Sequence, residues 1–163
     1  MFSAGDDKQV TFWDLEQNKA IHSFHGHLHG VYCLAIHPTI YVFYTGSRDC
    51  VCRVWDIRTK TNIHVFSGHE NTISSTMTLL SHPQVVVTSS HDSTMKLWDI
   101  RYGKTMETLT HHKKSIRVMA RTKVQPGLSI DTDVAIYALT YDVTGTILIT
   151  CEGDKTIKMW KQR

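Results

Sequence analysis

The stretch GHLHGVYCLAIHPTIYVFYTGSRDCVCRVWDIR, residues 26–58, holds a pattern that recurs along the chain. It opens with Gly-His, passes through a short apolar run and a turn, and ends in Trp-Asp. The four tryptophans follow one another at intervals of 42, 43 and 62 residues: Trp13, Trp55, Trp98 and Trp160. An aspartate stands six residues before each tryptophan, and a serine or threonine stands four residues before that aspartate. Because several landmarks keep the same spacing, the chain consists of internal repeats.

Short apolar runs between turn signals indicate β-strands inside each repeat. Three runs suit strands that are covered on both faces: VYCLAI (31–36), VVVTSS (85–90) and TILITC (146–151). Three mixed runs suit partly exposed strands: RVW (53–55), KLW (96–98) and KMW (158–160). No convincing amphipathic helix is present. Four short strands per period, with Gly-His and Trp-Asp landmarks, are the signature of the WD-repeat β-propeller.

We therefore predict an all-β fold, a partial WD-repeat propeller of about three and a half to four blades of four-stranded antiparallel sheet. The expected units are a partial blade (1–26), two full blades (27–68 and 69–111) and a composite blade (112–163) with a loop at 121–134. The blades are expected to form an open arc. Such an arc would expose apolar faces such as those of Val85–Val87 and Ile147–Ile149.

The third tryptophan interval is the long one, and it contains two candidate first strands, SIRVMA (115–120) and AIYALTYD (135–142). Only one set of second and third strands follows them. A deletion that joins the start of one blade to the loop before another is the simplest account. An intact repeat with a long insertion is the alternative.

The recurring His, hydroxyl, Asp and Trp resemble the hydrogen-bonded tetrad of WD blades. A buried carboxylate needs such donors around it, because burial of an unpaired charge is costly. The predicted tetrad residues are His27, Thr45, Asp49 and Trp55; His69, Thr88, Asp92 and Trp98; and Thr150, Asp154 and Trp160. A catalytic triad is the weaker interpretation, because the set repeats once per blade and an active site needs one set.

Composition excludes several classes of protein. The chain has 163 residues, a net charge of +3 and four cysteines. The small net charge argues against a basic protein that wraps nucleic acid, and the few cysteines argue against a disulfide-stabilised scaffold. We expect neither a membrane-spanning helix nor a secretory signal. The tract HGHLH (25–29) with Cys50 and Cys52 invites a zinc interpretation, but no second ligand pair has zinc spacing. We therefore expect no metal, no cofactor and no enzyme activity.

Longer stretches resemble the pleiotropic regulator family of WD-repeat proteins. The segments that carry the resemblance are AGDDKQV, FWDLEQNKA, GHLHGVYCLAIHPT, RDCVCRVWDIRTK, LWDIRYGKTMETLTHHKKSIRVMA, KVQPG and CEGDKTIKMWK. The family is nuclear, has a seven-bladed propeller and belongs to the spliceosome-associated NineTeen complex. The resemblance implies a scaffold in pre-mRNA splicing, with subunits of that complex as partners and direct RNA contact left open. A non-functional truncated copy is an alternative.

Two further sets of residues are candidates for partner contact. Arg58 and Arg101 complete Trp-Asp-x-Arg in consecutive repeats, a motif similar to the box by which WD-repeat substrate receptors dock on the adaptor of cullin-based ubiquitin ligases. A guanidinium offers a planar fork of donors to an acidic groove. His29, Arg48 and His91 are expected on the loops that face a partner in WD proteins.

Overall fold

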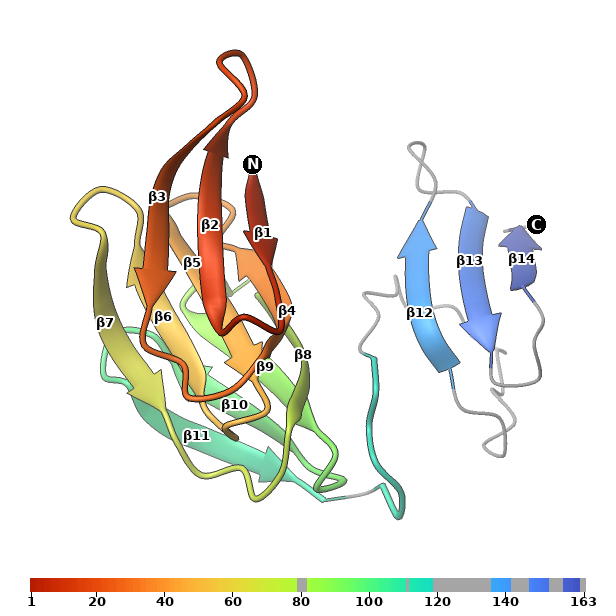
Figure 1. The fold of residues 1–163 in the computed structure, drawn as a ribbon. Coiled ribbons are helices and arrows are strands. Elements are labelled where there is room, and N and C mark those ends of the chain that lie inside the picture. The colour runs from red at the N-terminus through yellow and green to blue at the C-terminus, as the bar shows by residue number, and fades with distance from the viewer. Residues whose placement is uncertain (79–81, 111, 119–135, 142–146, 153–156, 162–163) are drawn as a thin grey trace. The chain divides into compact units, whose positions relative to one another are not determined.

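The computed structural model describes residues 1–78, 82–110 and 112–118, and the backbone strands 136–141, 147–152 and 157–161. Its chain falls into two compact units, Met1–Ile116 and Arg117–Arg163. The regular structure of the described residues consists of strands, which confirms the all-β prediction (Figure 1). No helix in this part of the chain has the length and hydropathy that a membrane crossing requires.

The first unit contains three antiparallel sheets, each formed by strands that follow one another along the chain. The first sheet has three strands: β1 (Phe2–Ala4), β2 (Gln9–Asp14) and β3 (Lys19–His25). The second has four: β4 (Val31–Ile36), β5 (Val42–Ser47), β6 (Cys52–Asp56) and β7 (Thr61–Phe66). The third also has four: β8 (Ile73–Thr78), β9 (Val85–Ser90), β10 (Met95–Asp99) and β11 (Lys104–Leu109). Each sheet is the meander expected of one propeller blade.

The second unit contains one antiparallel sheet of three described strands, in the order β12 (Ile136–Tyr141), β13 (Ile147–Glu152) and β14 (Ile157–Lys161). The expected first strand at 135–142 corresponds to β12. The other candidate, SIRVMA (115–120), was wrong in its described part, because residues 115–118 form no strand. The Ile116 backbone instead binds the third sheet: its N–H donates to the Ser90 carbonyl at 3.1 Å.

The backbone repeats its irregularities from sheet to sheet. In the first unit, the residue after each repeat aspartate has a positive φ of 66–68°: Lys8, Cys50 and Ser93. A second positive φ lies five residues after each tryptophan of this unit, at Asn18, Lys60 and Gly103. The ladder register also shifts next to Trp13, Trp55 and Trp98. The three sheets of the first unit therefore share turn and bulge geometry as well as strand order.

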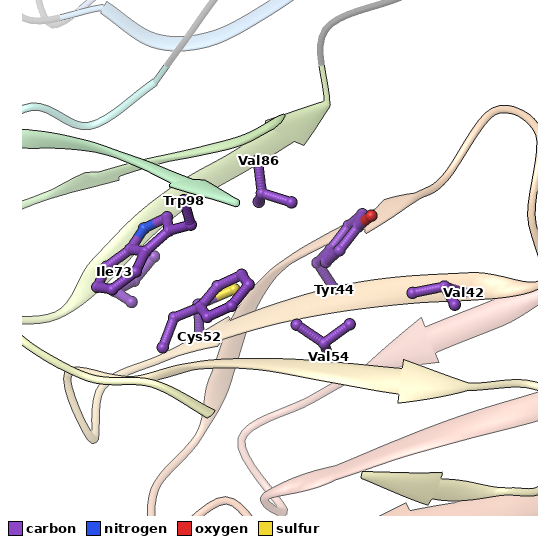
Figure 2. Packing of buried hydrophobic residues seen from close by; sticks show 8 residues of the cluster. Val42, Tyr44, Cys52, Val54, Ile73, Val86 and Trp98 are labelled. Atoms are coloured by element: carbon purple, nitrogen blue, oxygen red, sulfur yellow. The ribbon is translucent and has the colours of Figure 1, made fainter. Parts of the chain in front are cut away.

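Two apolar clusters join the three sheets of the first unit. One cluster lies between the first and second sheets and contains Val10, Phe24, Val31, Phe43 and Trp55. The other lies between the second and third sheets: Val42, Tyr44, Cys52, Val54, Phe66, Ile73, Val86 and Trp98 (Figure 2). The second sheet is therefore covered on both faces, which explains why all six residues of β5 are buried.

The expected exposure of Val85–Val87 was wrong. Val85, Val86 and Val87 are exposed by only 7%, 0% and 6%. The strand that carries them, β9, lies between β8 and β10, and Val86 also packs in the cluster with Trp98. The side chains of Ile147–Ile149 lie outside the described residues.

Candidate protein-interaction site

The second and third sheets each hold one complete chain of hydrogen bonds among the four repeat residues. In the second sheet, Trp55 Nε1 donates to Thr45 Oγ1 at 2.8 Å, and Thr45 Oγ1 lies 2.7 Å from His27 Nε2. His27 Nδ1 in turn lies 2.9 Å from Asp49 Oδ2. Since a carboxylate only accepts, His27 donates from Nδ1 to Asp49.

The third sheet repeats these distances almost without change. Trp98 Nε1 donates to Thr88 Oγ1 at 2.8 Å, and His69 Nε2 lies 2.8 Å from the same oxygen. His69 Nδ1 lies 2.8 Å from Asp92 Oδ2. Both threonines are fully buried, and both histidines are exposed by less than 8%. The spacing of the sequence landmarks thus brings the same four side chains together in two successive sheets.

Each aspartate also organises the turn in which it stands. Asp49 accepts from the backbone N–H of Leu28 at 2.9 Å and of Val51 at 3.2 Å. Asp92 accepts from the N–H of Glu70 at 3.0 Å and of Thr94 at 2.8 Å. Each carboxylate therefore ties its own turn to the loop that carries the histidine.

The charged form of both carboxylates is stabilised by these donors. Burial raises the pKa of Asp49, but the hydrogen bonds from His27 and Leu28 outweigh it and lower that pKa to about 2. The pKa of Asp92 is likewise about 2, because hydrogen bonds from Thr94, His69 and Glu70 outweigh burial. Burial lowers the pKa of His69, against the opposing effect of Asp92. The third-sheet pair is thus a neutral imidazole beside a carboxylate at neutral pH.

Two serines extend the network, and the sequence analysis missed them. Ser47 Oγ accepts from the Asp49 N–H at 3.1 Å and donates to the His29 carbonyl at 3.1 Å. Ser90 Oγ accepts from the Asp92 N–H at 3.1 Å and donates to the Asn71 carbonyl at 2.9 Å. A signal was present, because each serine stands two residues before the repeat aspartate.

The glycine before each tetrad histidine has a physical reason. Gly26 has a φ of 153° and Gly68 a φ of 137°, a region that side chains rarely adopt. A Cβ on Gly26 would stand 3.2 Å from Trp55 Cη2. The Gly-His pair therefore combines a backbone shape with a close approach to the indole.

In the first sheet, Ser3, Asp7 and Trp13 occupy the positions that correspond to the tetrad threonine, aspartate and tryptophan. Trp13 Nε1 donates to Ser3 Oγ at 2.7 Å, and Asp7 accepts from the Gln9 N–H at 3.2 Å. Thr150 and Trp160 lie on β13 and β14, whose side chains are outside the description. Asp154 lies outside the described residues.

The three expected partner contacts lie on loops whose backbones are held in place. The His29 carbonyl accepts from Ser47, and the Arg48 N–H donates to the Gly30 carbonyl at 3.1 Å. The His91 N–H donates to the Thr72 carbonyl at 3.0 Å. The side chains of His29 and Arg48 are exposed, and that of His91 is half-buried. Fixed backbone under exposed side chains reduces the entropic cost of binding a partner.

The two arginines after Trp-Asp have different environments. The Arg58 guanidinium carbon lies 4.0 Å from the centre of the Tyr41 ring. Arg101 instead forms two hydrogen bonds with Asp99, from Nε to Oδ1 at 3.1 Å and from Nη2 to Oδ2 at 2.7 Å. The Arg101 side chain is still 59% exposed. Both guanidinium groups therefore stand at the surface, one stacked and one paired.

The candidate zinc ligands do not form a site in the described part of the chain. No group of three His, Cys, Asp or Glu side chains there could hold a metal ion. His27 is hydrogen-bonded to Asp49 in its tetrad, and Cys52 is buried in the apolar cluster between the second and third sheets. Burial raises the pKa of the Cys52 thiol far above its ordinary value, so it remains protonated.

Comparison with known proteins gives similarity at the level of the repeat. The chain is 63% identical over 43 residues to the pleiotropic regulator PRL2 of Arabidopsis thaliana. It is 58% identical over 43 residues to the pleiotropic regulatory locus 1 protein of the same plant, and 37% identical over 67 residues to human striatin. These matches cover 26%, 26% and 41% of this chain and 9% of each relative. The chain therefore matches only a small part of these relatives.

A family model described as "WD domain, G-beta repeat" matches residues 18–56, 60–99 and 122–161. The three matches have nearly equal length, so the extra residues of the longest tryptophan interval lie between 99 and 122. Together the matches cover well over half of the chain, and each contains strands of the sheets described above. The chain belongs to the WD-repeat family.

Proposed function

We propose that this chain is a scaffold that binds proteins through the loops carrying His29, Arg48 and His91, within a spliceosome-associated complex in the nucleus. WD-repeat proteins act as platforms for protein interaction, and the tetrads supply a rigid frame for such loops. The observation that carries the proposal is the exposed pair His29 and Arg48 on backbone held by Ser47 and Gly30.

The splicing role is supported by the resemblance of whole segments to pleiotropic regulators and by the two plant relatives that bear that name. The relatives share one repeat-sized region with this chain, so the shared surface is that of a blade and its loops. On this basis the partners are subunits of the complex.

The test is affinity purification of the full chain from nuclear extract, followed by mass spectrometry. We expect spliceosomal proteins to copurify and the double change Arg48→Ala with His91→Ala to reduce their recovery. Lys104→Ala is the matched control, because it also removes one exposed cation and lies at the start of β11. Recovery of the same proteins by all three forms would contradict the assigned loop surface, and absence of spliceosomal proteins would contradict the splicing role.

A second function, docking on the adaptor of a cullin-based ubiquitin ligase, has one observation in its favour. Arg58 and Arg101 occupy equivalent turns of neighbouring sheets, and both are exposed. Tyr41 and Tyr102 lie under their guanidinium groups at 4.0 and 5.3 Å. Arginine and tyrosine are enriched at the energetic centres of protein interfaces.

A further inference from the structure

The loop before β4 and the turn after β5 lie side by side at one end of the second sheet. Three hydrogen bonds, at 2.9, 3.1 and 3.1 Å, join them in pairs: Leu28 with Asp49, His29 with Ser47, and Gly30 with Arg48. The side chains of Leu28, His29 and Arg48 are exposed. Their backbone is therefore fixed before a partner binds, which lowers the entropic cost of binding.

The third sheet has the same backbone frame but carries different side chains. Its three hydrogen bonds, at 3.0, 2.9 and 3.0 Å, join Glu70 with Asp92, Asn71 with Ser90, and Thr72 with His91. Glu70 thus stands where the second sheet has Leu28, and His91 stands where it has Arg48. Because the frames are equivalent, the two sheets differ here in the chemistry that their side chains offer.

Leu28 and Arg48 offer one apolar group and one cation. Leu28 is 70% exposed. Among the described residues Arg48 forms no ion pair, whereas Arg101 is paired with Asp99. A guanidinium on a fixed backbone presents a planar fork of donors that suits a carboxylate. A single exposed leucine is ordinary on a protein surface, but beside such a fork it favours a ligand that carries an apolar side chain next to its acid.

Acidic side chains border this pair on the neighbouring sheets. A Cβ added to Gly30 would clash with Asp6 Oδ1, so this carboxylate of the first sheet lies against the glycine that Arg48 holds. In the third sheet Glu70 is exposed. Like charges placed opposite each other suppress wrong partners. The two carboxylates therefore repel a long polyanion such as RNA, and they confine an acidic ligand to the second sheet.

We propose that this end of the second sheet binds a short acidic segment of a partner protein. A carboxylate of the segment pairs with Arg48, and an adjacent apolar side chain of the segment covers Leu28. The inference rests on the proposed scaffold function for its loop surface, and it adds the chemistry of the partner. The bordering Asp6 and Glu70 fix where along the surface the acidic group lies.

Selection from a phage-displayed library of random short peptides, with the full chain as bait, tests this chemistry. We expect peptides that bind the wild-type chain to be enriched in Asp and Glu next to Leu, Ile or Phe. Arg48→Glu should reverse the preference toward basic peptides, a gain that a misfolded chain could not show. The matched control is Lys104→Glu, which reverses one exposed charge at the start of β11 and should select the same acidic peptides as wild type.

The affinity of one selected acidic peptide, followed by fluorescence anisotropy, tests the two contacts separately. Arg48→Glu and Leu28→Glu should each raise its dissociation constant at least about tenfold. Leu28→Glu copies the residue that the third sheet carries on the same frame, so the loop should keep its shape. Leu28→Met keeps an apolar side chain and should bind like wild type. Added salt should weaken binding, because the contact with Arg48 is between opposite charges at the surface.

The outcomes separate this inference from the proposed function. Peptides without acidic enrichment, or the same peptides selected by wild type and Arg48→Glu, would overturn the inference even if spliceosomal proteins still copurify with the chain. Displacement of the selected peptide by an equal concentration of single-stranded RNA would also overturn it, in favour of a nucleic-acid surface. Acidic peptides selected as expected, with no spliceosomal protein recovered from nuclear extract, would support the inference and contradict the splicing role.

Discussion

Asp92 Oδ2 lies 2.8 Å from His69 Nδ1, and the same oxygen accepts the backbone N–H of Glu70 at 3.0 Å. Asp92→Ala would leave both donors without their acceptor inside the third sheet. We expect a loss of about 1–3 kcal/mol in the free energy of unfolding, the usual cost of stranding buried polar groups. Urea unfolding followed by tryptophan fluorescence would measure it.

The control for this change is Glu107→Ala on the exposed strand β11, which should cost less than about 0.5 kcal/mol. Asp49→Ala should behave like Asp92→Ala, because Asp49 has an equivalent histidine and two equivalent backbone donors in the second sheet. Equal unfolding midpoints for Asp92→Ala and Glu107→Ala would show that the tetrad does not stabilise its blade.

Acid should destabilise the chain in two stages. The pKa of His69 in the folded chain lies below its ordinary value of 6.5. As the pH falls through 6.5, this histidine therefore binds a proton in the unfolded chain before it does so in the folded chain. The free energy of unfolding decreases as a result. The pKa values of Asp49 and Asp92 are about 2 against an ordinary 3.8. Their contribution is present above pH 3.8 and is lost as the pH falls toward 2.

Unfolding midpoints measured at a series of pH values between 7 and 2 would show both stages. His69→Asn should flatten the first stage and leave the second stage in place for Asp49. A profile for His69→Asn that has the same slope as wild type between pH 7 and 5 would exclude His69 as the source of the first stage.

Gly46 and Gly5 should respond very differently to the same substitution. A Cβ on Gly46 would stand 2.5 Å from both Cys33 Sγ and Ile73 Cγ2, inside the contact between the second and third sheets. Gly46→Ala should therefore cost about 1–3 kcal/mol through overpacking. The nearest group to a Cβ on Gly5 would be the exposed Asp7 side chain, whose Oδ1 would lie 3.0 Å away. Similar thermal midpoints for the two variants would contradict the close contact at Gly46.

The two exposed arginines give a direct test of adaptor docking. Changing both Arg58 and Arg101 to Ala should weaken capture of the ligase adaptor, while circular dichroism stays unchanged. Capture assays with each single variant should show a larger loss for Arg58→Ala, because Asp99 already takes two N–H groups of Arg101. Equal capture by wild type and the double variant would exclude this second function.

Much of the fold was predictable because the same landmark residues recur at the same spacing in several repeats. The order of strands was expected from the repeat spacing, and the grouping of His27, Thr45, Asp49 and Trp55 from that spacing together with the resemblance to WD blades. Each set joins one sheet to the loop before it, over separations of 10 to 23 residues. Local patterns contain that information, since the residues share turns and neighbouring strands.

Contacts between sheets were not predictable in the same way. Whether Ser115–Val118 forms a β-strand depends on which other strand is available to pair with it. The sequence pattern of a first strand does not show which strand that is. The exposure of Val85–Val87 depended on which strands and clusters cover β9. Arg101 pairs with Asp99 and Arg58 stacks on Tyr41, although both follow the same Trp-Asp, because different side chains surround them.

His37 illustrates a contact of this second kind. Its Nδ1 accepts from the backbone N–H groups of Thr39 and Ile40, each at 3.1 Å. Its Nε2 therefore donates to the Pro83 carbonyl, at 2.9 Å and across 46 residues of sequence. Short-range contacts form rapidly and long-range ones wait for loop closure. The tetrads are thus suited to early steps of folding. The His37–Pro83 bond can form only later, when the second and third sheets pack against each other, so its formation would mark that step.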